Sequence, residues 1–350
     1  MRKTLIAAVI AVTGWAGPAL AEAEVVLKMH YFLPDQSFVP AEILKPWADA
    51  IEADSQGRIR IDRFPSMQLG GKPADLIDQM QDGVVDVVWT LPGYTPGRFP
   101  RTEVMELPFM VADAGTASRA LWRIAETDMI PTEFKDIKLL GLWVHGPGVI
   151  HSAKPVARLE DMAGQKLRSP SRLTAQLLEK LGATPVGMPA PAVPEAVSKR
   201  VIDGALLPWE VTSSVRIAEL VSHHTQFPTE GIYVSPLMLA MNKGVYDGLA
   251  PDLRAIIDAH SGEAFSAHAG AIQQGADAPM RDEAAARGND IVTLPPEEAM
   301  RWLDAALPVI EAWVDGSAAQ GFDGADLLAR TRAGIDAAMA EAPAAAPAKP

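Results

Sequence analysis

The sequence predicts an α/β protein in which helices cover mixed or parallel sheets. Two observations lead to this class. Short β-prone runs alternate with segments of helical periodicity through the first two thirds of the chain. From Asp252 to about residue 340 the chain is Ala-rich and reads as nearly all helical. No internal repeat of fixed period interrupts this pattern.

The first half of the chain supplies the alternation most clearly. Residues 39–51 carry apolar side chains at helical spacing, and Gly57 ends that helix. Pro73 fits the first turn of a second helix. Asp113 fits the N-cap of a third, which we expect to reach Thr127. Strands are predicted at residues 25–29, 59–64, 84–90 and 137–144.

The second half repeats this style before it becomes helical. In the first half, a Pro/Gly-rich loop at 91–98 follows the predicted strand at 84–90. Helices are predicted at residues 173–181 and 192–200, and strands at 184–188, 201–207 and 232–241.

The N-terminus has the layout of a secretory signal peptide. Arg2 and Lys3 precede an almost wholly apolar run at 5–12, and Ala-Leu-Ala at 19–21 supplies small residues two apart. The alternative, a membrane anchor, is disfavoured because spanning a bilayer takes ~20 apolar residues. We therefore predict a signal peptide over residues 1–21 that is cleaved on export to the periplasm.

Composition excludes several classes of site and partner. The chain has no cysteine, which rules out disulfides and thiol nucleophiles. Its net charge of −13 argues against nucleic acid and anionic membranes as partners, but not against a small anionic ligand. The Ala/Pro/Lys run at the C-terminus cannot bury a core, so residues 341–350 are predicted to form a disordered tail.

Four short segments carry a family resemblance. They read F-P-S-M-Q-L-G at 64–70, Q-M-Q-D-G-V-V-D at 79–86, L-E-D-M-A-G-Q-K-L-R at 159–168 and V-I-D-G at 201–204. In this order, behind a signal peptide and before a helical C-terminus, they resemble the DctP-type solute-binding proteins of TRAP transporters. The resemblance covers about residues 24–335.

This resemblance implies a two-lobed, periplasmic-binding-protein-like fold. Each lobe would be a mixed sheet flanked by helices, with a long connecting helix and a cleft that closes on an organic acid. The closed form would dock on the small and large membrane subunits of a permease. We expect residues 24–145 plus 234–272 to form lobe 1, and 146–233 plus 273–340 to form lobe 2.

The resemblance also implies that Arg168, at the end of the K-x-R strand, pairs with the ligand carboxylate. A guanidinium offers a fixed fork of donors that matches a carboxylate. Most lone arginines are surface charges, but Arg168 ends a strand-like alternation just before Ser169 and Pro170. Arg172 ranks lower because it falls at an expected helix start.

Departures from the family pattern point to an apolar ligand. No arginine occurs in residues 144–151, where some members place a second one, and no asparagine occurs in 206–210, where binders of sugar acids place one. Five aromatic residues fall near the expected cleft, although aromatic residues at strand ends are often core. The candidate wall residues are Tyr31, Phe32, Trp89, Tyr94 and Trp209.

We therefore predict binding of an organic monocarboxylate, such as a benzoate or hydroxybenzoate. An aliphatic keto or hydroxy acid is the alternative. Histidine at position 145 leaves two roles open, since His145 could donate to the ligand or bond to backbone at a hinge. Adjacent His223 and His224 would face opposite sides of a strand, so no metal site and no cofactor are expected.

Two other classes of protein compete with this prediction. An exported enzyme is disfavoured because the chain lacks a Gly-x-Ser-x-Gly elbow, a His-Glu-x-x-His motif and a phosphate loop, although a scattered Ser/His/Asp set is not excluded. A ligand sensor that docks on a signalling receptor would share the fold and differ only in its partner.

Overall fold

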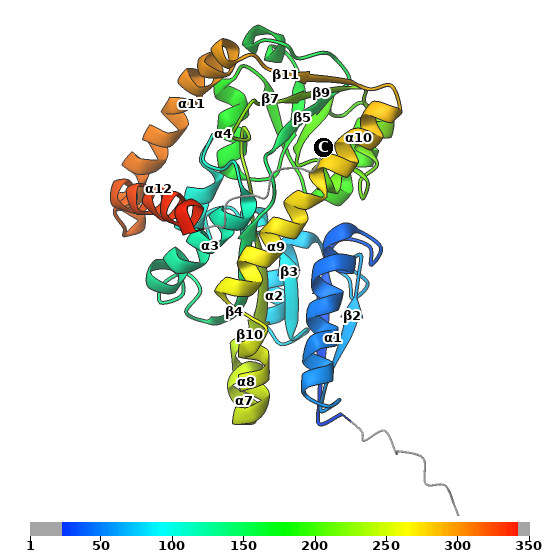
Figure 1. Ribbon diagram of the computed structural model, residues 1–350, viewed down its shortest axis with the longest axis vertical. Coiled ribbons are helices and arrows are strands. Elements are labelled where there is room, and N and C mark those ends of the chain that lie inside the picture. The colour runs from blue at the N-terminus through cyan, green and yellow to red at the C-terminus, as the bar shows by residue number, and fades with distance from the viewer. Residues whose placement is uncertain (1–22, 342–350) are drawn as a thin grey trace, which may run out of the picture.

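The computed structural model describes residues 23–341, which form two mixed β-sheets flanked by helices (Figure 1). The first sheet has the strand order β2-β1-β3-β10-β4. It contains β1 (Val25–Tyr31), β2 (Ile59–Phe64), β3 (Val87–Thr90), β4 (Ile137–Val144) and β10 (Pro236–Asn242). The β1 pairings with β2 and β3 are parallel, whereas β10 runs antiparallel to both of its neighbours.

The second sheet has the strand order β11-β9-β5-β8-β6-β7. Strand β6 lies parallel to both β7 and β8, so their carboxyl ends meet at one edge. The sheet contains β5 (Val149–Ser152), β6 (Lys166–Ser169), β7 (Thr184–Gly187), β8 (Gly204–Leu207), β9 (His223–Gln226) and β11 (Asp290–Thr293). The predicted two-lobed α/β class is confirmed.

Helices cover both sheets. The α-helices are α1 (Lys45–Asp54), α2 (Leu76–Gln81), α3 (Ala114–Ile124), α4 (Arg172–Lys180), α5 (Val193–Ser198), α6 (Ile217–Leu220), α7 (Lys243–Gly248), α8 (Pro251–Ala259), α9 (Glu263–Gly275), α10 (Asp277–Ala286), α11 (Pro296–Ser317) and α12 (Gly324–Glu341). Short 3₁₀ or π segments are η1 (Pro40–Leu44), η2 (Pro73–Asp75), η3 (Pro92–Tyr94), η4 (Thr102–Glu106), η5 (Ala125–Met129), η6 (Leu159–Met162), η7 (Ala190–Ala192), η8 (Glu210–Thr212) and η9 (Ala318–Gln320). None of the helices within residues 23–341 is long and apolar enough to cross a membrane.

Three segments connect the two sheets. Residues 145–148 join β4 to β5, and residues 227–235 join β9 back to β10. The third connection is the pair α9 and α10, separated only by Ala276, which Figure 1 shows as one yellow run from the first sheet to the second. Helix α9 packs against α3 and β4, while α10 leads into β11. The expected long connecting helix is therefore a nearly continuous pair.

The first two connecting segments pack closely against each other. The amide of Gly148 donates to the carbonyl of Tyr233 at 2.9 Å. A Cβ on Gly148 would lie 2.3 Å from Cε1 of Tyr233, and one on Gly231 would lie 2.5 Å from the amide nitrogen of Gly148. Since real Cβ contacts are not that short, both positions require glycine. The absence of a side chain at these two positions is what allows the backbones of the two connecting segments to approach this closely.

Several predicted strands begin earlier than the observed ones. Strand β3 begins at Val87, because Gly83 adopts a φ of +74° and the turn leaves Val84 51% exposed. Strand β8 begins at Gly204 for a similar reason, since Arg200 has a φ of +56° and precedes an exposed Val201. Asp113 does cap α3, accepting from the Thr116 amide at 2.8 Å.

Two features of the second half differ from the prediction. Strand β11 occurs within the stretch predicted to be all helical, where it pairs in parallel with β9. Helix α12 packs against α3 rather than beside the second sheet, and Arg330 bonds Asp128 there at 2.6 Å. The assignment of 273–340 to lobe 2 stays a prediction, and these contacts place α12 beside a helix of the other predicted lobe. Glu341 is the last residue of α12, so the tail does not begin there.

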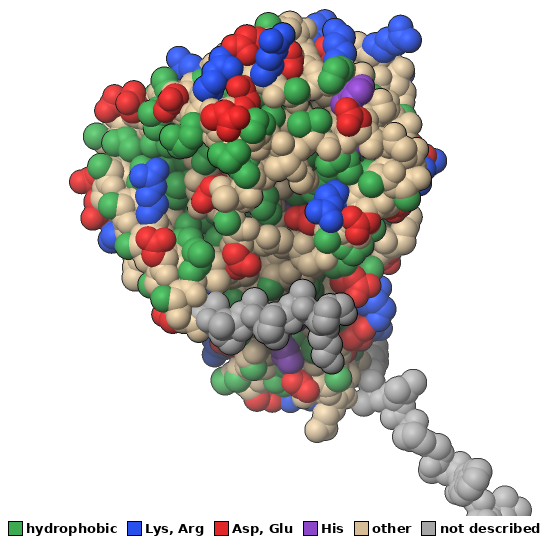
Figure 2. All heavy atoms as spheres, turned by 45° about the horizontal axis from the view of Figure 1, so that its top comes forward, with side chains coloured by type: hydrophobic (Ala, Val, Ile, Leu, Met, Phe, Trp, Pro, Cys, Tyr) green, Lys and Arg blue, Asp and Glu red, His purple; other side chains and the backbone are tan. Residues whose placement is uncertain are grey.

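The signal peptide and residues 342–350 lie outside the described residues, and the exact lobe boundaries stay a prediction. On the face in Figure 2, acidic and basic side chains are interspersed rather than gathered into regions of one sign. The net charge of −13 is thus not concentrated on that face.

The packing of the connections predicts a sharp asymmetry between two glycine substitutions. Gly148→Ala should lower the free energy of unfolding by ~1–3 kcal/mol, because the added methyl overlaps the Tyr233 ring. Gly316→Ala, in α11 with open space around its Cα, should raise it by ~0.5–1 kcal/mol. Urea unfolding of both variants measures this, and equal stability of the two would contradict the packing argument.

Candidate functional site

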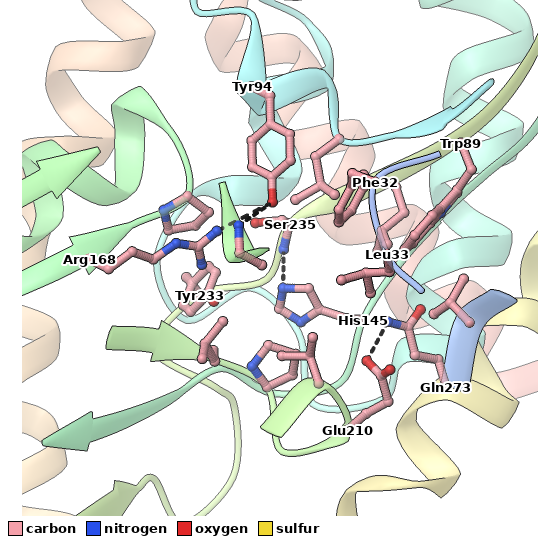
Figure 3. A pocket seen from close by; sticks show the side chains of 18 residues that line it. Phe32, Leu33, Trp89, Tyr94, His145, Arg168, Glu210, Tyr233, Ser235 and Gln273 are labelled. Atoms are coloured by element: carbon pink, nitrogen blue, oxygen red, sulfur yellow. Dashed lines mark hydrogen bonds between the residues drawn. The ribbon is translucent and has the colours of Figure 1, made fainter. Parts of the chain in front are cut away.

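A cavity with about 420 Å³ of empty space lies between the two sheets. Side chains from both sheets and from the connecting segments line it, and Figure 3 shows ten of them labelled. Five of the seven predicted site residues line it, namely Phe32, Trp89, Tyr94, His145 and Arg168.

Arg168 is the cation of the cavity. It lies near the end of β6 and is only 2% exposed. Its Nε donates to the carbonyl of Met188 and one terminal nitrogen to the carbonyl of Leu206, both at 2.9 Å. The other terminal nitrogen lies 3.5 Å from the Tyr94 hydroxyl. The Tyr233 hydroxyl also hydrogen-bonds Arg168. A guanidinium has five N–H donors, so after the two carbonyl contacts the remaining donors serve only tyrosine hydroxyls and any further acceptor.

No carboxylate within residues 23–341 pairs with Arg168; its hydrogen-bond acceptors there are two backbone carbonyls and the hydroxyls of Tyr94 and Tyr233. Burying a charge that lacks an opposite charge costs free energy. The fold therefore holds a positive charge in place by dipoles alone, and an anion entering the cavity would recover part of that cost.

An aromatic wall faces this cation. The ring of Phe32 stacks on Trp89 with centroids 4.6 Å apart and an interplanar angle of 15°, and it meets Tyr94 edge-on at 5.6 Å. The Tyr94 hydroxyl accepts from the amide of Ala190 at 3.1 Å, which links η3 of the first lobe to η7 of the second. Burial raises the pKa of Tyr94, so the hydroxyl stays neutral.

His145 bonds to backbone through both ring nitrogens. Its Nδ1 lies 2.6 Å from the Gly146 carbonyl, and its Nε2 lies 3.0 Å from the amide of Ser235. Nδ1 therefore donates and Nε2 accepts. Burial lowers the pKa of His145 to about 4, so the ring is neutral. Of its two predicted roles, this geometry matches the backbone-bonded residue, although the ring still lines the cavity.

Tyr233 and Ser235 lie in the second connection and were not predicted. The Tyr233 ring stands edge-on to His145 with centroids 5.3 Å apart. Burial raises the pKa of Tyr233, while the nearby charge of Arg168 acts the other way. The buried hydroxyl of Ser235 has no hydrogen-bond partner among the described residues. The Tyr-Val-Ser-Pro sequence at the start of β10 was the only signal for them.

Glu210 was also missed by the sequence reading. Its Oε2 accepts from Nε2 of Gln273 at 2.9 Å, and its backbone amide donates to Oδ1 of Asp277 at 2.8 Å. Burial raises the pKa of Glu210 to about 8, with Gln273 lowering it and Asp277 raising it to a lesser degree. Burial likewise raises the pKa of Asp277 to about 7. Glu210 is thus mainly protonated at neutral pH.

Trp209, predicted as a ligand-wall residue, is not among the residues that line this cavity. Its ring packs 5.0 Å from His151 and from His224, and its Nε1 donates to Gln226 at 3.3 Å. Its neighbours Pro208 and Glu210 line the cavity instead. The side chains of Pro208 and Glu210 therefore point into the cavity, whereas the side chain of Trp209 between them packs beside Ala284 of α10.

Tyr31, also predicted as a wall residue, is likewise not among the residues that line this cavity. It is fully buried in β1, and its hydroxyl donates to Asp35, which pairs with Arg63 at 3.1 Å. Phe32, one position later, faces the cavity. Because neighbouring strand residues point to opposite faces, only one of the two can line the site.

Arg172 lies at the start of α4 and binds a carboxylate of its own. Its Nε donates to Glu103 of η4 at 3.2 Å, and its terminal nitrogen contacts the same carboxylate. This ion pair joins the two lobes outside the cavity. The lower rank of Arg172 as a ligand anchor agrees with this position.

His223 and His224 lie on β9. Nδ1 of His224 lies 2.7 Å from Nδ1 of His151, while its Nε2 lies 2.9 Å from the amide nitrogen of Asn289. Burial lowers the pKa of His224 to about 4. In the described part of the chain no three His, Asp or Glu side chains are grouped to hold a metal ion.

A two-lobed α/β fold with a buried cation between the lobes defines a solute-binding protein. Residues 30–315 match the bacterial extracellular solute-binding protein family 7, DctP, and the chain belongs to this family. The predicted resemblance is confirmed.

Solved structures narrow the comparison. A TRAP solute-binding protein from Rhodoferax ferrireducens, in complex with copurified benzoate, is 47% identical with a TM-score of 0.89, covering 91% of this chain and 99% of that one. A marine metagenome TRAP protein specific for aromatic acid ligands, in complex with 3-hydroxybenzoate, is 40% identical with a TM-score of 0.88, covering 90% and 99%.

A curated relative agrees on the class. The 2,3-diketo-L-gulonate-binding periplasmic protein YiaO of Escherichia coli is 26% identical over 230 residues, which span 63% of this chain and 67% of the relative. These relatives are extracytoplasmic solute-binding proteins rather than enzymes, as the sequence predicted. Proteins of this kind bind small carboxylates and work with membrane permease subunits.

The buried carboxyl predicts how stability depends on pH. The pKa of Glu210 rises on folding from about 4.5 to about 8, so the folded state binds more protons between those pH values. The free energy of unfolding should therefore fall with rising pH in this window, relative to Glu210→Gln, by up to ~1.4 kcal/mol per pH unit.

Urea unfolding of wild type and Glu210→Gln at pH 5, 6, 7 and 8 measures the difference. Because Asp277 is present in both proteins, most of its own titration cancels in the subtraction. A difference that stays constant over this range would show that Glu210 is already ionised in the folded protein.

Proposed function

We propose that the chain is the extracytoplasmic solute-binding subunit of a TRAP-type secondary transporter and captures an aromatic monocarboxylate, such as a benzoate or hydroxybenzoate. Residues 1–21 direct its export and are then removed. The ligand-loaded form delivers its cargo to the small and large membrane subunits of the permease.

The single observation that carries this proposal is the buried, carboxylate-free guanidinium of Arg168. Its contacts with the carbonyls of Met188 and Leu206 fix the plane of the guanidinium before any ligand binds. The two carbonyls use only two of the five N–H donors, so a bidentate carboxylate can share the others with the neighbouring tyrosine hydroxyls. The unpartnered hydroxyl of Ser235, also in the cavity lining, supplies a further donor.

The aromatic wall supports an aromatic body for the ligand. Phe32 and Trp89 present stacked rings, and apolar walls with few polar groups hold a ligand in one orientation. The relatives with bound benzoate and 3-hydroxybenzoate, at 47% and 40% identity, point the same way. An aliphatic keto or hydroxy acid would leave these rings without a stacking partner.

Lobe closure follows from contacts that cross the cavity. Arg168 and Ala190 of the second lobe both contact the Tyr94 hydroxyl of the first, and Arg172 pairs with Glu103 nearby. We propose that the lobes separate by hinge motion in the segments 145–148 and 227–235, which admits the acid. Closure then excludes water and strengthens the arginine–carboxylate pair.

Replacing Arg168 tests the anchor. Arg168→Ala should weaken binding of benzoate or 3-hydroxybenzoate by ~3–5 kcal/mol, because it leaves a buried carboxylate unpaired. Isothermal titration calorimetry measures the dissociation constants. Arg158→Ala, which removes an exposed arginine bonded only to Asp161 in its own turn, should bind normally. Near-normal affinity of Arg168→Ala would refute the assignment.

Adjacent substitutions test the aromatic wall. Phe32→Leu should weaken benzoate binding by ~0.5–1.5 kcal/mol, because it removes a ring that lines the cavity and stacks on Trp89. Tyr31→Phe, one residue earlier, should leave the affinity unchanged since its hydroxyl bonds Asp35 outside the cavity. Equal losses in both variants, measured by calorimetry, would place the ligand elsewhere.

A further inference from the structure

Glu210 is the only carboxylic acid that lines the cavity within the described residues. It is 1% exposed and comes from η8, three residues after β8 ends. In Figure 3 Glu210 and Arg168 reach the cavity from different sides, with His145 between them in this view. A carboxyl group in a cavity of mostly apolar walls needs a reason, because burying a polar group costs free energy unless it is hydrogen-bonded.

Three elements hold this carboxyl in one position. Trp143 of β4 donates its Nε1–H to Oε1 of Gln273 at 2.8 Å, which orients the Gln273 amide. The Nε2 of Gln273 then donates to Oε2 of Glu210 at 2.9 Å. Asp277 of α10 accepts the Glu210 backbone amide at 2.8 Å. The side chain is thus fixed from the first sheet, from α9 and from α10.

The second oxygen, Oε1 of Glu210, is buried and has no hydrogen-bond partner among the described residues. The hydrogen bond from Gln273 accounts for Oε2, but no hydrogen bond within residues 23–341 accounts for the burial of Oε1. The protonated form, which burial favours by raising the pKa to about 8, carries its proton on the free oxygen because Oε2 already accepts. The group can then donate a hydrogen bond without adding a negative charge beside an anionic ligand.

We propose that Glu210 is a specificity-determining residue that hydrogen-bonds a ring hydroxyl of the ligand through its free Oε1. This inference rests on the proposed function, since Arg168 must take the carboxylate of the same molecule. The ligand class narrows to hydroxylated aromatic monocarboxylates, which span an anion anchor and a neutral hydroxyl anchor at once. Benzoate itself fills the cavity but leaves the second anchor unused.

The test compares ligands of the same shape on one protein. Calorimetry gives dissociation constants of wild type for benzoate, the three hydroxybenzoates and the three toluates, in which a methyl replaces the hydroxyl. At least one hydroxybenzoate should bind about ten-fold tighter than its matching toluate, because the toluate leaves the buried Oε1 unpartnered. This arm needs no variant and so does not depend on any substitution folding.

The second arm changes the residue. Glu210→Leu should bring the ratio of benzoate to best hydroxybenzoate dissociation constants to about one. Glu210→Gln should keep most of the preference, since its amide retains a donor and an acceptor. Circular dichroism confirms that each variant is folded.

The outcomes separate the two proposals. If wild type binds no aromatic acid at all, the proposed function fails. If it binds benzoate and every toluate at least as tightly as the matching hydroxybenzoate, the function stands and the role of Glu210 is overturned. A hydroxyl preference that persists in folded Glu210→Leu overturns it equally.

Discussion

The burial of one guanidinium between two lobes is the constraint on which the site depends. Arg168 can be only 2% exposed because backbone carbonyls at the ends of the two neighbouring strands accept hydrogen bonds from its guanidinium. Met188 comes directly after β7, and Leu206 belongs to β8. Parallel pairing of β6 with both strands brings these carbonyls to the end of β6. The second sheet is therefore what makes a buried cation tolerable without a carboxylate.

The two connecting segments set the opposite boundary of the cavity. Their close approach requires glycine at 148 and 231, and it places His145, Tyr233 and Ser235 beside one another. His145 is neutral because burial lowers its pKa, so it serves as a bridge between backbone groups rather than as a second cation. The part of the chain that we propose bends during closure is thus also a part that lines the site.

The sequence was sufficient for features that depend on local pattern. Strands β2 and β4, the cap of α3 at Asp113 and the position of Arg168 at a strand end all follow from a few neighbouring residues. It was insufficient where one residue decides the face. Tyr31 and Phe32 differ by one position, as do Trp209 and Glu210, and composition cannot tell which member faces the cavity. The cavity position of Glu210 and the strand β11 depend on contacts between segments distant in sequence, so no local signal marked them.

The charge of the cavity ties these features together. Arg168 contributes one positive charge, and an ionised Glu210 would add a negative charge to the lining of the same cavity. Burial prevents this by raising the pKa of Glu210 to about 8, and the Gln273 contact stabilises the carboxyl without forcing it to ionise. The cavity therefore presents a single net positive charge at neutral pH. That charge balance matches a ligand with one carboxylate and disfavours a second, because a dicarboxylate would bury an additional anion against a neutral acid.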